Sequence, residues 1–95
     1  MTDFNARMAQ LRVRFQVRAA EDRVRLAAAL AAEDRAETRR LAHGLSGSGG
    51  VFGFAELSSA AEAVEVAVDA DCAWDEVEKL CAVLLRMLDE AVQPV

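Results

Sequence analysis

The chain has 95 residues, of which 54% are hydrophobic, and a net charge of −5. This length supports one hydrophobic core and the apolar content is too high for a disordered segment, so we expect a single domain over residues 1–95. The acidic balance argues against a nucleic-acid partner, and with neither an apolar run of about 20 residues nor a signal-peptide pattern we expect no membrane contact and a cytoplasmic location.

The first predicted element is one long helix, or two helices with a bend, over residues 4–30. Apolar residues recur there every three or four positions, as one face of a helix requires. This stripe comprises Phe4, Met8, Leu11, Phe15, Ala19, Leu26 and Leu30. Asp34 then predicts the N-cap of a second helix, with Glu37 three residues later reaching back as in a capping box.

Two more helices follow a break near Gly53. Their apolar stripes are Leu57, Ala61, Val64 and Val68, and then Val77, Cys81, Leu84, Leu88 and Ala91. Short connections favour antiparallel neighbours, and four helices with one apolar stripe each hide those stripes best around a shared axis. We therefore predict an all-α, antiparallel four-helix bundle. Because the bundle uses every stripe that we identified, we expect a monomer.

The stretch "LAHGLSGSGGVFGF" at residues 41–54 contains the single histidine and all five glycines. At about 100° per residue, an inward face is predicted that contains Leu41, Leu45, Ser48 and Phe52. His43 lies about 200° from Leu41 on this helical wheel. The histidine is therefore predicted to point into solvent, and a histidine buried in the core is disfavoured.

Small residues follow His43 on the same side of the predicted helix. Ser46, Gly47 and Gly50 stand three, four and seven positions later, although each glycine inside a helix costs about 1 kcal/mol relative to alanine. We interpret these residues as clearance that lets another surface approach the ring. The alternative is a flexible loop over residues 44–53; the helical phase of Leu45 and Phe52 favours the helix.

Other kinds of functional site do not fit the residue spacing around His43. The glycine stretch has neither the Gly-x-Ser-x-Gly order of a nucleophile elbow nor the lysine of a phosphate-binding loop. One histidine without nearby cysteine ligands predicts no metal site, and we interpret Cys72 and Cys81 as free thiols. A lone exposed imidazole, which titrates near pH 6.5 when unperturbed, is instead suited to accept a phosphoryl group from a donor that brings its own metal ion.

The stretch "LAHGLSGSGGVFGFAEL" resembles the core motif of histidine phosphotransfer (HPt) domains. That motif is roughly Ala-His-x-Leu-Lys-Gly-x-Ser/Ala-x-x-aliphatic-or-aromatic-Gly, followed by a leucine. The matching positions are Ala42, His43, Leu45, Gly47, Ser48, Phe52, Gly53 and Leu57. The resemblance is tight over about 17 residues, and the order and length of the predicted helices extend it over the chain.

The resemblance implies that His43 is a phosphoacceptor that relays phosphoryl groups between aspartates of response-regulator receiver domains, with a hybrid histidine kinase as a further candidate partner. It implies a carrier and not a stand-alone enzyme, with no cofactor of its own and Mg²⁺ on the receiver. Ser46 departs from the motif, where lysine is usual. Arg39 and Arg40, one turn before His43, could supply the missing charge and form a basic rim for an acidic receiver.

Two other functions remain open from the sequence. A helical adaptor could bind and inhibit a receiver or kinase domain without transferring phosphoryl, and the serine at position 46 would then mark the lost transfer. An assembly subunit unrelated to signalling would require a large exposed apolar patch. The predicted stripes leave none, which disfavours it.

Overall fold

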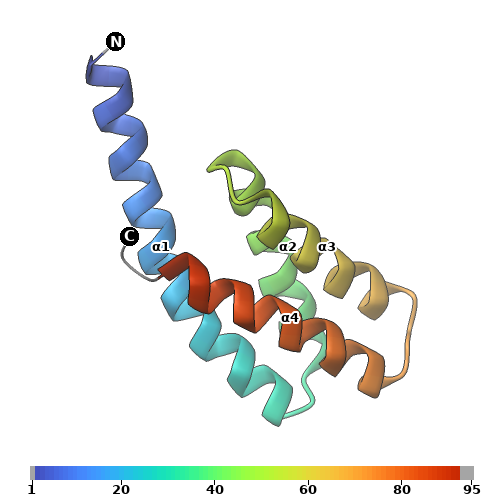
Figure 1. Ribbon diagram of the computed structural model, residues 1–95. Coiled ribbons are helices and arrows are strands. Elements are labelled where there is room, and N and C mark those ends of the chain that lie inside the picture. The colour runs from blue at the N-terminus through green and yellow to red at the C-terminus, as the bar shows by residue number, and fades with distance from the viewer. Residues whose placement is uncertain (1, 93–95) are drawn as a thin grey trace.

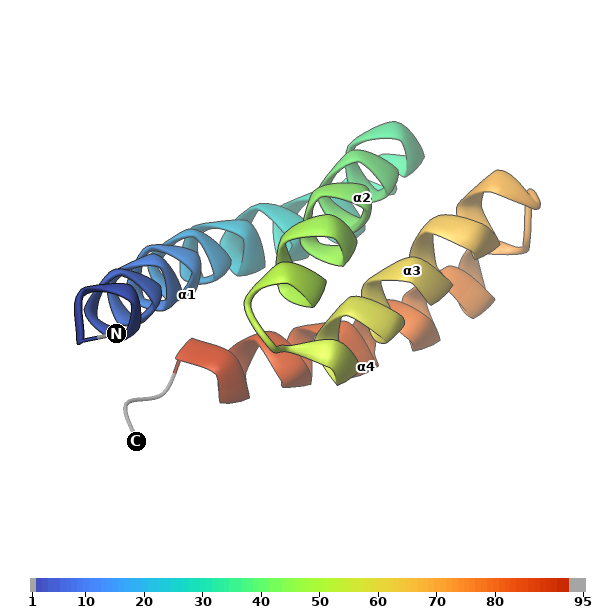
Figure 2. The same ribbon diagram turned by 90° about the horizontal axis from the view of Figure 1, so that it is seen from above.

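The computed structural model describes residues 2–92, which form four helices and contain no strand. The helices are α1 (Thr2–Ala31), α2 (Arg35–Val51), α3 (Ala55–Asp69) and α4 (Trp74–Val92). Helices α1 and α3 each contact both α2 and α4, so the bundle is a closed ring whose short connections make consecutive helices antiparallel (Figure 1 and Figure 2). The predicted all-α four-helix bundle is confirmed. None of the helices within residues 2–92 has the length and apolar character of a membrane span.

The three turns between helices share one geometry. Each contains a residue with positive φ: Glu33 at 51°, Gly53 at 84° and Asp71 at 58°. In each turn the following backbone N–H donates to the carbonyl five residues earlier, at 2.8–3.0 Å. This is the Schellman arrangement that satisfies free carbonyls at a helix end. Of these three residues only Gly53 is a glycine, which adopts positive φ without strain.

Helix α2 begins at the predicted cap. The Asp34 carboxylate accepts a hydrogen bond from the backbone N–H of Glu37 at 3.0 Å. The side chain of Glu37 does not reach back toward the cap, as the sequence suggested, but accepts a hydrogen bond from Nε of Arg40 at 3.0 Å. One half of the predicted capping box is therefore replaced by an ion pair within the first turns of the helix.

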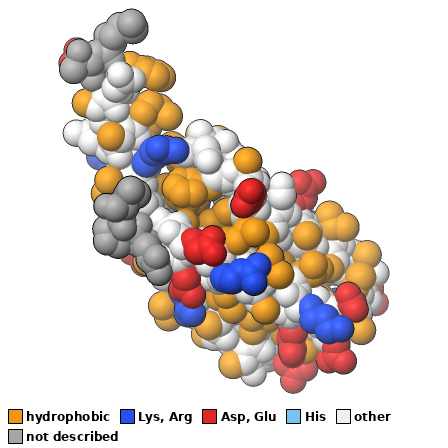
Figure 3. Space-filling model, viewed as in Figure 1, with side chains coloured by type: hydrophobic (Ala, Val, Ile, Leu, Met, Phe, Trp, Pro, Cys, Tyr) orange, Lys and Arg blue, Asp and Glu red, His pale blue; other side chains and the backbone are white. Residues whose placement is uncertain are grey.

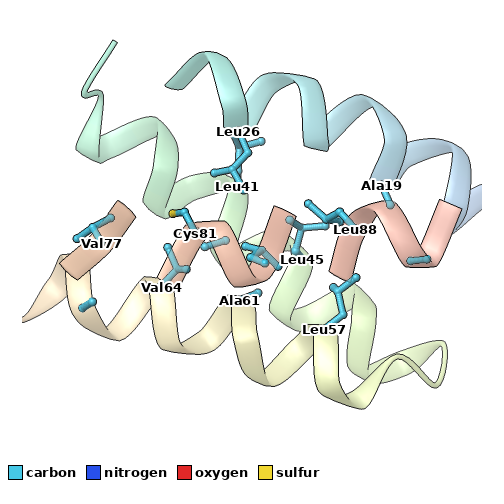
Figure 4. Packing of buried hydrophobic residues seen from close by; sticks show 14 of the residues in the cluster. Ala19, Leu26, Leu41, Leu45, Leu57, Ala61, Val64, Val77, Cys81 and Leu88 are labelled. Carbon is cyan, nitrogen blue, oxygen red and sulfur yellow. The ribbon is translucent and has the colours of Figure 1, made fainter. Parts of the chain in front are cut away.

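One apolar core fills the ring, with side chains from all four helices directed into it (Figure 4). Every predicted stripe residue of α4 is buried, and on α3 the stripe ends at Ala67 in place of Val68, which is half-buried. The largest fully buried side chains are Leu26, Leu45, Leu84, Leu88, Val64, Val77, Thr38 and Cys81. Thr38 satisfies its hydroxyl by donating to the Asp34 carbonyl at 2.8 Å.

The predicted stripe of α1 enters this core only from Phe15 onward. Phe4 is 66% exposed, and Met8 and Leu11 are half-buried. The physical reason is length: α1 has 30 residues against 15–19 in the other helices, so its first turns project past their ends (Figure 1 and Figure 2). The assignment of Phe4 to the core was wrong.

We predict that Val64→Ala lowers the free energy of unfolding by about 1–3 kcal/mol, because it leaves a cavity in a packed core. Val64 is fully buried on α3, whereas Val66 on the same helix is 58% exposed. Val66→Ala is therefore the matched control, with an expected change below about 0.5 kcal/mol. Urea titrations of both variants measure the difference, and equal effects would contradict the described core.

Candidate functional site

Helix α2 stays helical through its glycines, and the loop interpretation of residues 44–53 was wrong. Its buried face consists of Thr38, Leu41, Ala42, Leu45 and Gly49. Ser48, which the helical wheel placed inward, is exposed and Gly49 is buried in its place. The face is rotated because α3 lies close to Gly49: a Cβ there would be 3.2 Å from Cδ2 of Leu57 and 3.4 Å from the Phe54 carbonyl.

His43 points away from this buried face, as predicted. Its side chain is 70% exposed, and its Nδ1 lies 2.7 Å from Oε2 of Glu65 on α3. The Glu65 side chain is only 16% exposed. An ionised carboxylate only accepts hydrogen bonds, so Nδ1 carries the proton and donates a hydrogen bond to Glu65. The other ring nitrogen, Nε2, is left with its lone pair.

Both arginines that precede His43 are engaged by acidic side chains. Arg39 forms an ion pair with Glu65, with Nη2 3.2 Å from Oε2, and donates a hydrogen bond from Nε to Oδ1 of Asp69 at 2.6 Å. The hydrogen bond from Arg39, together with the positive charge of its guanidinium, holds the pKa of Asp69 below its ordinary value. Arg40 is paired with Glu37 on its own helix. The rim around the ring therefore contains three carboxylates, those of Glu37, Glu65 and Asp69, against two guanidinium groups.

The model of the Hpt domain family matches residues 10–94. The chain belongs to the Hpt domain family. Hpt domains are phosphocarrier modules that interact with receiver domains and kinases, so this chain belongs to phosphotransfer-related two-component signalling. Neither the curated proteins nor the solved structures gave a match.

The sequence did not reveal the acidic side of this Hpt site. Glu65 and Asp69 stand four residues apart on α3, so they share one face of that helix. This spacing was the available signal. It did not identify the partner, because 22 residues separate Glu65 from His43 and only the packing of α3 on α2 joins them.

The glycines of the Hpt motif divide into two kinds. A Cβ at Gly44 or Gly47 would meet nothing within 4 Å, whereas Gly49 is packed against α3 and Gly53 has positive φ. A Cβ at Gly50 would lie at an ordinary 3.5 Å from Oγ of Ser58. The fold itself therefore does not require glycine at positions 44 and 47, and the space beside His43 is open to a partner.

Ser46 lies within α2 at its packing contact with α3, beside the predicted site. Its side chain is half-buried, and its carbonyl accepts a hydrogen bond from Oγ of Ser58 at 2.6 Å. This bond takes up a backbone acceptor of α2 and helps to hold the two helices together. Ser46 is therefore close to the contact between the two helices that supply His43 and Glu65.

The cysteines lie apart from this site. Cys72 is half-buried and Cys81 is fully buried, and both are free thiols. Burial raises the pKa of Cys81 to about 11. Cys81 therefore stays protonated at neutral pH and packs as a small apolar side chain. Within residues 2–92, no group of three or more His, Cys, Asp or Glu side chains is arranged to hold a metal ion.

We predict that Gly47→Ala raises the free energy of unfolding by about 0.5–1 kcal/mol, because alanine favours a helix interior and the space for its methyl group is open. Gly53→Ala is the contrasting variant and is expected to lower stability by about 1 kcal/mol, because φ is 84° there. Chemical denaturation of both proteins gives the comparison. A loss of stability in Gly47→Ala would show that the glycine serves the fold.

Proposed function

We propose that His43 accepts a phosphoryl group at Nε2 from an aspartyl phosphate of a response-regulator receiver domain and passes it to the aspartate of another receiver. The observation that supports this most is the 2.7 Å contact between Nδ1 of His43 and Oε2 of Glu65. This contact favours the proton on Nδ1, so that Nε2 is the nucleophilic nitrogen. The 70% exposure of the side chain gives that nitrogen room for a donor.

The transfer needs no base from this chain. Nε2 attacks the phosphorus in line, a P–N bond forms, and the P–O bond to the aspartate breaks so that the aspartate leaves as a carboxylate. The imidazole then carries a positive charge with Nδ1–H retained, and the Glu65 carboxylate offsets that charge. Mg²⁺ on the receiver neutralises the phosphoryl oxygens. Return of the phosphoryl group to an aspartate reverses each of these steps.

The proposed roles of the surrounding residues follow from their contacts. Arg39 acts as a positioning residue, because its guanidinium holds Glu65 and Asp69. Arg40, with its side chain 65% exposed, is at the docking surface for the acidic face of a receiver. Gly47 and Gly50 give that receiver clearance. Ser46 stands where most Hpt domains carry lysine, so the phosphoryl group receives less positive charge from this side.

The wider assignment is part of the same proposal. We place the chain, as one domain over residues 1–95, in the cytoplasm as a phosphoryl carrier and not as a stand-alone enzyme. Its partners are receiver domains and a hybrid histidine kinase. The four helices enclose one core cluster, which supports the single domain.

Incubation with a phosphorylated receiver domain tests the transfer. We expect the wild-type protein to acquire an acid-labile, base-stable label and His43→Gln to acquire none, because glutamine has no nucleophilic nitrogen. Receivers from the source organism serve as donors in turn. Equal labelling of the two proteins would defeat the assignment of His43.

The same experiment separates the carrier from the adaptor. An inhibitory adaptor predicts tight binding to a receiver, no phosphohistidine, and an affinity that His43→Ala leaves unchanged. That pattern, measured by calorimetry alongside the labelling, would replace the relay by the adaptor.

We predict that Glu65→Gln slows phosphoryl uptake by about three- to tenfold, because the amide cannot offset the charge that the ring acquires. Glu62→Gln removes the same charge from an exposed position on α3 and is the matched control. Nitrogen-15 NMR of the ring provides a second measurement. It should show Nδ1–H predominating in the wild type and a shift toward Nε2–H in Glu65→Ala; unchanged tautomers would remove Glu65 from the mechanism.

A further inference from the structure

Helix α1 has a second apolar face, which points away from the bundle. Val13, Val17 and Val24 are 57%, 56% and 66% exposed, and they account for half of the large hydrophobic side chains that are exposed among the described residues. On the helix they lie roughly opposite the core residues Phe15 and Leu26. Hydrophobic side chains are visible along the projecting part of α1 in Figure 3. The bundle does not use this face.

The outer face has the spacing of a coiled coil. Positions on it alternate by four and three residues over about 38 Å of helix, which is the heptad pattern that two helices need to pack along one line. The positions are Ala6, Gln10, Val13, Val17, Ala20, Val24, Ala27 and Ala31. We call this set the outer seam. All are exposed except Ala27, which is half-buried.

The projecting part of α1 has little support within the described chain: Arg12 donates from Nε to the Phe52 carbonyl at 3.2 Å, and Met8 and Leu11 are half-buried. Between residues 3 and 14 no side chain is buried, yet this segment is helical and continues beyond the other helices. About three turns of helix with little tertiary packing are marginal in water. A surface that packs along the outer seam would stabilise them.

We propose that the outer seam binds the outer seam of a second copy of this chain in antiparallel orientation. The register that pairs heptad positions places Val17 opposite Ala20 of the second copy and Val13 opposite Val24 of the second copy. The projecting turns of each copy then lie on the bundled half of the other α1. A shallow hollow lined by Ala9, Gln10, Val13 and Arg14 would receive Val24 of the second copy.

Charge complementarity supports the choice of a second copy and of the antiparallel orientation. Arg14 and Glu21 occupy equivalent heptad positions on one edge of the seam, are exposed, and have no ion pair within the described residues. In the proposed register Arg14 lies beside Glu21 of the second copy, and two-fold symmetry repeats the pair. A parallel pair would not bring these residues together, because there the edge of one helix faces the other edge of its partner.

The opposite edge of the seam is already held by the bundle. Gln16 donates to the Ala91 carbonyl at 2.8 Å, and Arg23 is paired with Asp89 on α4. These contacts fix the rotation of α1, so the seam faces outward. His43 leans toward α3, away from α1, and stays open in such a dimer. The expectation of a monomer assumed that every apolar stripe lies inside the bundle, and the outer seam does not.

Sedimentation equilibrium over a range of concentrations tests the proposal. We expect the wild-type chain to approach twice its mass of 10.3 kDa, and Val17→Glu to remain at the single mass. Val66→Glu, at an equally exposed valine of α3, is the matched control and should dimerise normally. Because both valines face solvent, circular dichroism should show both variants folded. A wild-type chain that is monomeric up to about 1 mM overturns the proposal, as does a dimer that Val17→Glu leaves intact.

A charge swap tests the orientation. Arg14→Glu and Glu21→Arg should each raise the Kd of the dimer by roughly tenfold, because each turns two attractive contacts into repulsive ones. The double variant should recover the wild-type Kd, since both pairs are restored with reversed charge. A double variant that is weaker than either single variant would overturn the antiparallel register.

Discussion

The close packing of α2 on α3 is the constraint on which the site depends. Gly49 favours this approach, because a Cβ there would lie only 3.2 Å from Cδ2 of Leu57 and 3.4 Å from the backbone at the start of α3. With the helices this close, the buried face of α2 includes Gly49, and His43 lies outside that face with its side chain 70% exposed. The same approach brings Glu65 within hydrogen-bond distance of the ring. The packing of α2 on α3 thus decides which acidic side chain meets the imidazole.

The charge distribution around His43 differs from the basic rim that the sequence predicted. Each guanidinium beside His43 is paired with at least one carboxylate, and three carboxylates stand against two guanidinium groups, so the surface around the ring has no excess of positive charge. The lowered pKa of Asp69 keeps its link to Arg39 ionised as the pH falls through the ordinary carboxyl range. Ser46 adds no charge to this surface.

The two faces of helix α1 have different surroundings. Its inner face, with Phe15 and Leu26, builds the bundle, while its outer seam faces solvent on the side away from His43. An interface on that seam would not compete with a receiver for the ring.

The sequence by itself determined the helices, the exposure of the histidine and the family, because helical phase and cap residues are local and the Hpt motif is contiguous. It did not determine which residues meet across helices. Ser48 and Gly49 differ by one position, and only the approach of α3 decides which of them is buried. Glu65 became a partner of His43, and Arg39 a partner of Glu65, through packing between residues 22 and 26 positions apart. Phe4 followed the helical phase of the core yet lies in solvent, because periodicity specifies a face of a helix and the length of its neighbours decides how much of that face is covered.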